Sequence, residues 1–255
     1  GALYLTATFL TYFFYTKLNF QFFLSILSAI AVSALLGILF YKLIFDRLRK
    51  HKENKTSLLL ASFGLFTLIE GTILLIFGAS PKSYGFSAQK GISILGASIT
   101  ATQIIIITAS IIILIMLYLL LKKTKLGISL RAISDNKTIA STLGINFNRV
   151  SYISIIIASV LASIAGILFG LDQGIFHTMG LRAILVAFTA SVVGGMGNIP
   201  AAMLGAFLVG LIENLGILYL PSEFKNAIAF IVLIIFLLLK PNGLCGIKIR
   251  EEMAG

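Results

Sequence analysis

Residues 101–121 read ATQIIIITASIIILIMLYLLL, an uncharged run that ends at a pair of lysines. A helix rises about 1.5 Å per residue, so a helix over this run can cross a hydrocarbon core roughly 30 Å thick. Two similar uncharged runs cover 20–41 and 150–171, and the run 56–78 carries only Glu70. The sequence therefore predicts four membrane-spanning helices.

Four further apolar segments are shorter. One covers 2–16, one covers 226–239, and two are halves of a run that GGMGNIP at 194–200 interrupts. Of the 255 residues, 58% are hydrophobic and 11% are charged, and the mean hydropathy is +1.05. A soluble core could not bury so much apolar surface. We therefore expect an all-α polytopic membrane protein with about eight transmembrane segments, some discontinuous, in one domain over 1–255.

Basic residues are unevenly divided among the loops. When the segments alternate across a bilayer, most of the 20 Lys and Arg residues fall on one side, in loops 42–55, 122–149 and 240–250. Cytoplasmic loops carry the excess of Lys and Arg, so that side is predicted to face the cytoplasm. The net charge of +11 therefore indicates orientation in a membrane rather than nucleic-acid binding.

The loop 122–149 is polar and basic, and it contains the signals of a short amphipathic helix over 134–144. Such a helix could dock on a cytoplasmic partner. The alternative is a solvated loop with an incidental helical turn. The helix signals are Ser134 or Asp135 as the cap, Ile139 and Leu143 four apart on one face, and Gly144 as the stop.

Four segments resemble the permeases of ATP-binding-cassette (ABC) importers, specifically the branched-chain amino-acid permeases of the LivH type. GISLRAISDNKTIASTLGINFNRV at 127–150 is similar to their cytoplasmic loop, and RLRKHKENKTSLLLASFGLFTLIEGTILLIFG at 47–78 to their basic loop and the helix after it. VAFTASVVGGMGNIPAAMLGAFLVGLIENLG at 186–216 is similar to their glycine-broken late segments, and FKNAIAFIVLIIFLLLKPNGLCG at 224–246 to their last helix. The resemblance covers nearly the whole chain and implies a transmembrane permease domain over 1–255. The family's first helix has no counterpart, so we expect a truncated N-terminus.

The resemblance also implies that the loop 122–149 carries a helix that docks on an ATPase. Many ABC permeases have an EAA-x-x-x-G pattern in this loop, whereas this chain has Thr138, Ile139 and Ala140 followed by Gly144. The glutamate is therefore absent, and the pattern implies a docking surface of small and apolar residues with other polar contacts. Ile139, Ala140 and Leu143 are expected to form the apolar face that docks. The candidate coupling residues are Arg131, Asp135, Ile139, Ala140, Leu143 and Gly144.

Two carboxylates and a glycine cluster are candidates for the translocation pathway. A charge inside a membrane is costly unless it is paired or hydrated, so such residues face a bundle interior or a wet cavity. A broken helix at membrane depth must likewise be covered by protein or line a cavity. The alternatives are a packing role for the carboxylates and a tight cytoplasmic turn for the glycines. The candidates are Glu70, Gly194, Gly195, Gly197, Asn198 and Glu213.

Catalytic and metal sites are not predicted. The histidines are His51 and His177 and the one cysteine is Cys245, which are too few for a catalytic triad or a metal centre. No phosphate-binding loop occurs in the sequence. ATP hydrolysis is therefore assigned to separate subunits, and no cofactor is assigned to this chain.

By resemblance, we expect a multi-pass subunit of a bacterial or archaeal cytoplasmic membrane that works by alternating access. Its partners would be a second homologous permease, two cytoplasmic ATPases, and an extracytoplasmic binding protein that delivers leucine, isoleucine or valine. Membrane lipid would surround it, and nucleic acid would not bind. Two alternatives stay open: a permease for urea or amides, and a self-sufficient secondary carrier, which would need no docking helix.

Overall fold

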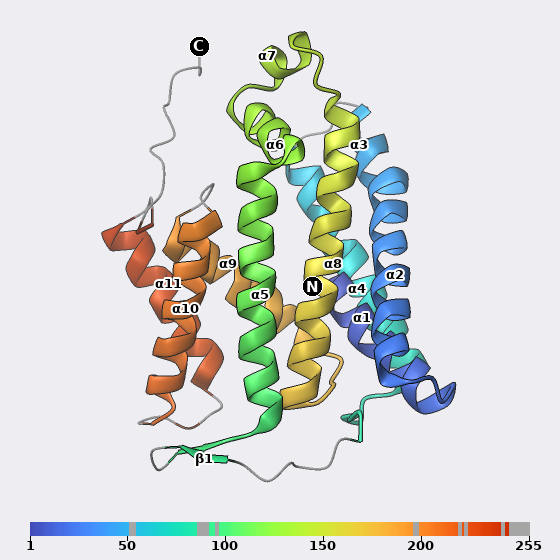
Figure 1. Ribbon diagram of the computed structural model, residues 1–255, viewed down its shortest axis with the longest axis vertical. Helices are drawn as coiled ribbons and strands as arrows, with labels where there is room; N and C mark the ends of the chain where they lie inside the picture. Colours follow the sequence, from blue (N-terminus) through green and yellow to red (C-terminus); the bar gives the residue numbers. More distant parts are fainter. Residues whose placement is uncertain are drawn as a thin grey trace. The chain divides into compact units, whose positions relative to one another are not determined.

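Figure 1 shows the computed structural model, which describes residues 1–50, 55–85, 92–94, 97–195, 199–218, 221, 224–240 and 243–244. The described residues are mostly helical, which confirms the prediction of an all-α polytopic membrane protein. The chain divides into two compact units, unit 1 over Gly1–Gly180 and unit 2 over Leu181–Gly255. One domain over 1–255 stays a prediction.

Four of the described helices are long and apolar enough to cross a membrane. They confirm the four long runs predicted from the sequence, and all four belong to unit 1. They are α2, Phe22–Phe40, which continues through η2, Tyr41–Phe45, into α3, Asp46–Lys50; α4, Lys55–Phe77; α5, Ala101–Lys123; and α8, Phe147–Gln173.

The other described helices are shorter. The predicted interruption of the late apolar run is confirmed, because one helix ends at Gly194 and the next begins at Ile199. These helices are α1, Ala2–Tyr12, with the π-helical η1, Phe13–Lys17; α6, Lys125–Asp135; α7, Lys137–Thr142; α9, Met179–Gly194; α10, Ile199–Gly216; and α11, Lys225–Leu239.

A small hairpin precedes α5 and was not predicted from the sequence. Strands β1, Ile92–Ile94, and β2, Ala97–Ile99, pair antiparallel, with Ser93 opposite Ser98. The alternation of apolar residues with serine in both segments is the period-two pattern of a strand. The segments are too short for that pattern to stand out beside the long apolar runs.

Small side chains form the seam of unit 1, where α1, α2 and α8 pack together. A Cβ built on Gly37 would lie 2.2 Å from the Ser159 hydroxyl oxygen, and one built on Gly166 would lie 2.4 Å from the Tyr4 carbonyl oxygen. Helices in membranes associate through such close approach. The buried face of α2 consists of residues four apart, Ser25, Ala29, Ser33 and Gly37.

The loop after α4 is fixed to this seam. The main chain of Lys82 exchanges two hydrogen bonds with that of Ile175, with N···O distances of 2.8 and 2.9 Å. The Tyr84 hydroxyl donates to the Thr8 carbonyl at 3.1 Å, and the Tyr84 ring lies edge-on to Phe22. Tyr84 is only 2% exposed. Residues far apart in the sequence therefore hold this loop.

Unit 2 is built around the three helices α9, α10 and α11. Apolar side chains of these helices form its core, and a Cβ built on Gly216 would lie 2.5 Å from Ile228 Cδ1. The glycine lets α10 approach α11 closely. The buried core residues are Val193, Val209, Ile228 and Val232, and Val186, Ile212 and Phe236 pack against them.

Candidate functional site

The connector between α5 and α8 begins with a sharp turn at Thr124. This residue has an extended backbone (φ −99°, ψ 156°), which ends α5 and starts α6. Its hydroxyl donates to the Leu120 carbonyl and accepts from the Gly127 amide at 3.2 Å. One side chain thus satisfies a carbonyl at the end of one helix and an amide at the start of the next. Figure 1 shows α6 lying across the end of α5.

The turn is closed by a second pair of residues on α6. A Cβ built on Gly127 would lie 2.0 Å from the Leu121 carbonyl oxygen, so only glycine lets the two backbones come this close. The Arg131 guanidinium donates a hydrogen bond to the same carbonyl. A basic group at a helix C-terminus also interacts favourably with the helix dipole. We call Thr124, Gly127 and Arg131, with the last turn of α5, the elbow.

The next helix, α7, is capped by Asn136. The Asn136 side-chain oxygen accepts from the amides of Thr138 and Ile139 at 2.9 and 3.1 Å. The prediction that Ser134 or Asp135 would cap this helix is wrong. Both residues lie inside α6, and the chain leaves the helical conformation only at Asn136 (φ −154°, ψ 109°).

Gly144 stops the helical segment that contains α7, as the sequence predicted. Its backbone is left-handed (φ +84°), and its amide donates to the Ser141 carbonyl at 3.1 Å. The Ile145 amide donates to the Ala140 carbonyl, also at 3.1 Å. Together these two hydrogen bonds make a Schellman motif, in which a glycine reverses the chain after a helix.

The apolar face of α7 differs from the predicted one. Ile139 and Leu143 are 59% and 75% exposed, whereas Ala140 is 2% exposed. Residues four apart share a helix face, and the next residue along is turned about 100° away. The Schellman motif also folds Ile145 back toward Ala140. Ile139 and Leu143 are therefore accessible to a partner, and the expectation that Ala140 belongs to that face is corrected.

Two other predicted coupling residues have places in the connector. Arg131 is engaged at the elbow, and Asp135 is the last residue of α6. The residues of the elbow were not predicted as a group. Thr124 and Lys125 at the end of the apolar run, with Gly127 two residues later, are the local signal that could have indicated a tight turn.

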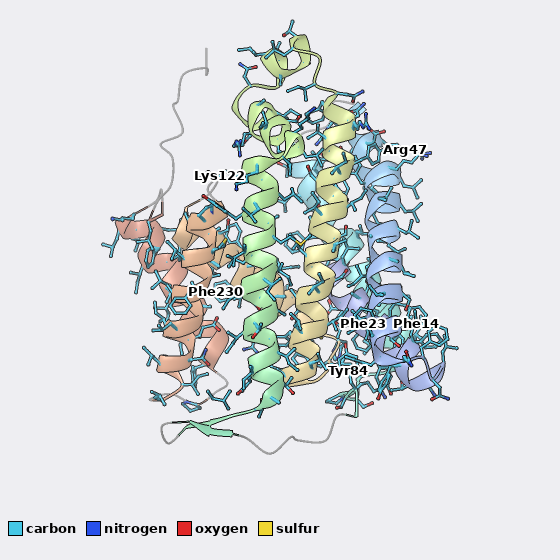
Figure 2. All side chains as sticks on the ribbon, in the orientation of Figure 1. Phe14, Phe23, Arg47, Tyr84, Lys122 and Phe230 are labelled. Atoms are coloured by element: carbon cyan, nitrogen blue, oxygen red, sulfur yellow. The ribbon has the colours of Figure 1, made fainter. Side chains whose placement is uncertain are left out.

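Charge is concentrated at the connector end of unit 1. Figure 2 shows Arg47 and Lys122 at one end and Tyr84 at the other. The Arg49 guanidinium donates to the Tyr41 hydroxyl at 3.1 Å and lies 4.9 Å from the centre of the Phe147 ring. The basic segment after α2 therefore contacts the first residue of α8. Its cytoplasmic orientation stays a prediction.

The glycine break in unit 2 brings α9 and α10 into backbone contact. A Cβ built on Gly194 would lie 2.1 Å from the Ala201 carbonyl oxygen, and one built on Gly205 would lie 2.2 Å from the Ala190 carbonyl oxygen. The two glycines therefore serve close helix packing. Gly197 and Asn198 lie outside the described residues, and a role for the break in the pathway stays a prediction.

A segment after α11 occupies the space beside the break. The Leu244 amide donates to the Val193 carbonyl at 2.9 Å. A Cβ built on Gly243, whose φ is +74°, would lie 2.5 Å from the Cα of Gly195. We call this contact of 243–244 with Val193 and Gly195 the clasp. Sequence reasoning missed it, because nothing local to Gly243 indicates a partner so far back in the chain.

The predicted carboxylates lie in different units. Glu70 is half-buried on α4 of unit 1, and Glu213 is buried on α10 of unit 2. The structure therefore gives no geometry between them. Among the described residues, no group of three or more His, Cys, Asp and Glu side chains could hold a metal ion. Cys245 lies outside the described residues.

The sequence matches one protein family over most of its length. That family is described as "Branched-chain amino acid transport system / permease component", and the match covers residues 1–237. No solved structure matches the chain.

Three relatives illustrate the similarity. The chain is 36% identical over 151 residues to the high-affinity branched-chain amino acid transport system permease protein LivH of Escherichia coli K12, covering 59% of this chain and 49% of the relative. It is 29% identical over 204 residues to BraD of Pseudomonas aeruginosa, covering 76% and 65%. It is 31% identical over 245 residues to a probable LivH of Methanocaldococcus jannaschii, covering 90% and 76%. The chain thus spans about half the length of the Escherichia coli relative that it matches.

Proposed function

We propose that this chain, which belongs to the family of branched-chain amino acid transport permease components, is a membrane-spanning subunit of an ATP-driven importer. Its cargo would be leucine, isoleucine or valine, as the names of its relatives suggest. It would lie in a bacterial or archaeal cytoplasmic membrane. Two ATPases, a second homologous permease and an extracytoplasmic binding protein would complete the complex.

One observation carries the proposal beyond family membership. Ile139 on α7 and Leu143 at its C-cap are large apolar side chains exposed to solvent in a connector that is largely polar and basic. Exposed apolar side chains on a capped helix fit a groove in a partner protein. A secondary carrier driven by an ion gradient would have no use for such a helix, because its driving force does not come from a cytoplasmic motor.

The proposed mechanism is alternating access, with α7 as the point at which the ATPase acts. Burial of Ile139 and Leu143 in an ATPase groove would contribute about 1.5–3 kcal/mol for each side chain. ATP-driven movement of the ATPases would displace α7, and the permease would open its pathway to one side of the membrane at a time. No residue of this chain would take part in the hydrolysis.

The test replaces both apolar side chains of α7. The double variant Ile139→Asp, Leu143→Asp should weaken ATPase association by at least about a hundredfold, because it removes two buried side chains and would bury two charges. Association is measured by pull-down from detergent-solubilised complexes, and transport by uptake of radiolabelled leucine with unlabelled valine or urea as competitor.

Asn148→Asp is the matched control. Asn148 is exposed in the first turn of α8, in the same loop, where one added negative charge is tolerated near a helix N-terminus. Its ATPase association and uptake should equal those of the parent chain. Full association by the double variant would overturn the docking role of α7. Competition by urea but not by valine would overturn the proposed cargo.

A further inference from the structure

We propose that Arg131 is a positioning residue that makes α5 and α6 one rigid lever, so that displacement of α7 moves α5. This inference rests on the proposed function, because it assumes that an ATPase acts on α7. Ile139 and Leu143 would contact the ATPase, and the elbow would transmit the resulting displacement of α7 to α5.

The elbow has the contacts that a rigid joint requires. Its three residues all act on the last turn of α5: Thr124 bonds the Leu120 carbonyl, and Arg131 bonds the Leu121 carbonyl. Gly127 lies so close to Leu121 that any side chain would collide with its backbone. Two hydrogen bonds and a backbone contact on adjacent residues leave α6 little freedom to swing relative to α5.

The joint between α6 and α7 is also closed. A single residue, Asn136, separates the two helices. Its amide donates to the Ala132 carbonyl at 3.1 Å, and its side chain caps the first amides of α7. Asn136 therefore belongs to the hydrogen-bonding pattern of both helices. A force on α7 acts on α6 with no flexible linker between them.

The helix α5 is held less tightly than the other long helices of unit 1. None of its residues, all of which the structure describes, is buried within this chain. By contrast, α8 buries Ser159, Ser163 and Gly166 in the seam with α1 and α2. Displacement of α5 would break few apolar contacts within the chain, whereas displacement of α8 would disrupt the seam. The lever should therefore move α5 and leave the seam in place.

Loss of the Arg131 hydrogen bond should uncouple ATP hydrolysis from transport. Arg131→Met keeps most of the apolar stem and removes every donor. In the full complex with both ATPases, the second permease and the binding protein in lipid vesicles, the leucine imported per ATP hydrolysed should fall about tenfold. ATPase association should stay at the parent level, because the proposed docking residues Ile139 and Leu143 are unchanged.

Three further variants complete the test. Arg131→Lys keeps a charged donor and should restore the ratio to within about threefold of the parent. Gly127→Ala forces α6 away from Leu121 by a different route and should reproduce the loss. Arg149→Met removes another exposed positive charge from the same connector and should leave the ratio unchanged. A nitroxide on exposed Ile128 should gain mobility in Arg131→Met.

The outcomes distinguish the lever from the docking surface. An unchanged transport ratio in Arg131→Met would overturn the lever, as would an immobile nitroxide at Ile128. Loss of ATPase association in Arg131→Met would also overturn it, because Arg131 would then contact the ATPase itself. If the parent complex neither bound ATPase nor imported leucine, the proposed function would fail, and the lever that depends on it would fail too.

Discussion

The two ends of unit 1 hold their loops in opposite ways. At one end, Tyr84 is buried and its hydroxyl donates to the carbonyl of Thr8, 76 residues earlier, and Lys82 pairs with Ile175. At the other end, the connector is ordered by short-range contacts, such as the cap on α7 and the Schellman motif at Gly144. Long-range contacts fix a loop to the bundle, whereas local contacts shape a segment and leave its surface accessible to a partner.

The largest expected effect tests whether the fold at the end of unit 1 that contains Tyr84 depends on the packing of α1 against α8. Gly166→Leu would place a Cβ 2.4 Å from the Tyr4 carbonyl oxygen and force α1 away from α8. We expect a loss of stability of about 3 kcal/mol or more, because overpacking and lost helix contacts add together. Fluorescence-detected size-exclusion chromatography after heating would report the fraction of folded protein.

Gly64→Leu is the control for this substitution. Gly64 is also a glycine of a long helix, but a Cβ built there meets no atom within 4 Å. Its melting behaviour should match that of the parent. If both variants melted alike, the close approach of α1 and α8 would not be what fixes this end.

Asn136→Ala, in the connector, should have a smaller effect than Gly166→Leu, and it should act on ATPase affinity. Loss of an N-cap side chain costs about 1 kcal/mol of helix stability, and α7 is short, so its folded population should fall. ATPase affinity should drop about fivefold, measured by titration of the purified ATPase onto the solubilised permease. The melting temperature of the bundle should not change. A lower melting temperature would mean that the connector is not locally folded.

Tyr84→Phe tests the opposite end of unit 1, and its effect on stability should be comparable to or smaller than that of Asn136→Ala on α7. It removes the hydrogen bond to Thr8 and keeps the aromatic ring against Phe22. The free energy of unfolding should decrease by about 0.5–1.5 kcal/mol, seen as a lower melting temperature. ATPase affinity should equal that of the parent. An effect of this variant on affinity would show that the two ends are coupled rather than independent.

The smallest effect concerns pH. Burial raises the pKa of the Tyr84 hydroxyl above its ordinary value, so the hydroxyl stays a protonated donor. A raised pKa in the folded state gives stability that is fully present below about pH 10 and is lost as the pH rises further. The melting difference between the parent and Tyr84→Phe should be constant from about pH 7 to pH 9 and narrow above about pH 10. A difference that varied within the lower range would contradict this assignment.

The long helices were predictable because their signal is local. An uncharged run of sufficient length predicts a membrane span without any knowledge of its neighbours, as residues 101–121 did for α5. Gly144 was predictable for the same reason, since a glycine after a short amphipathic pattern indicates a left-handed stop. The cap was misplaced because α6, which was not predicted, extends through Ser134 and Asp135.

The contacts between distant residues were not predictable from the same patterns. Nothing next to Tyr84 in the sequence indicates that its hydroxyl reaches Thr8, and nothing next to Leu244 indicates that its amide reaches the Val193 carbonyl. Glu70 and Glu213 were chosen as charges within apolar runs, which identifies them as unusual but not as neighbours. Sequence periodicity places a residue on a helix face, and the partner of that face depends on the tertiary structure.

The clasp determines when one backbone hydrogen bond of unit 2 can form during synthesis. The Val193 carbonyl lies in the last turn of α9, and its partner, the Leu244 amide, is synthesised only after α10 and α11. While the ribosome is still translating those helices, the carbonyl must bond water or another backbone group, because an unpaired carbonyl in an apolar environment is costly. The clasp can therefore close only after residue 244 has left the ribosome.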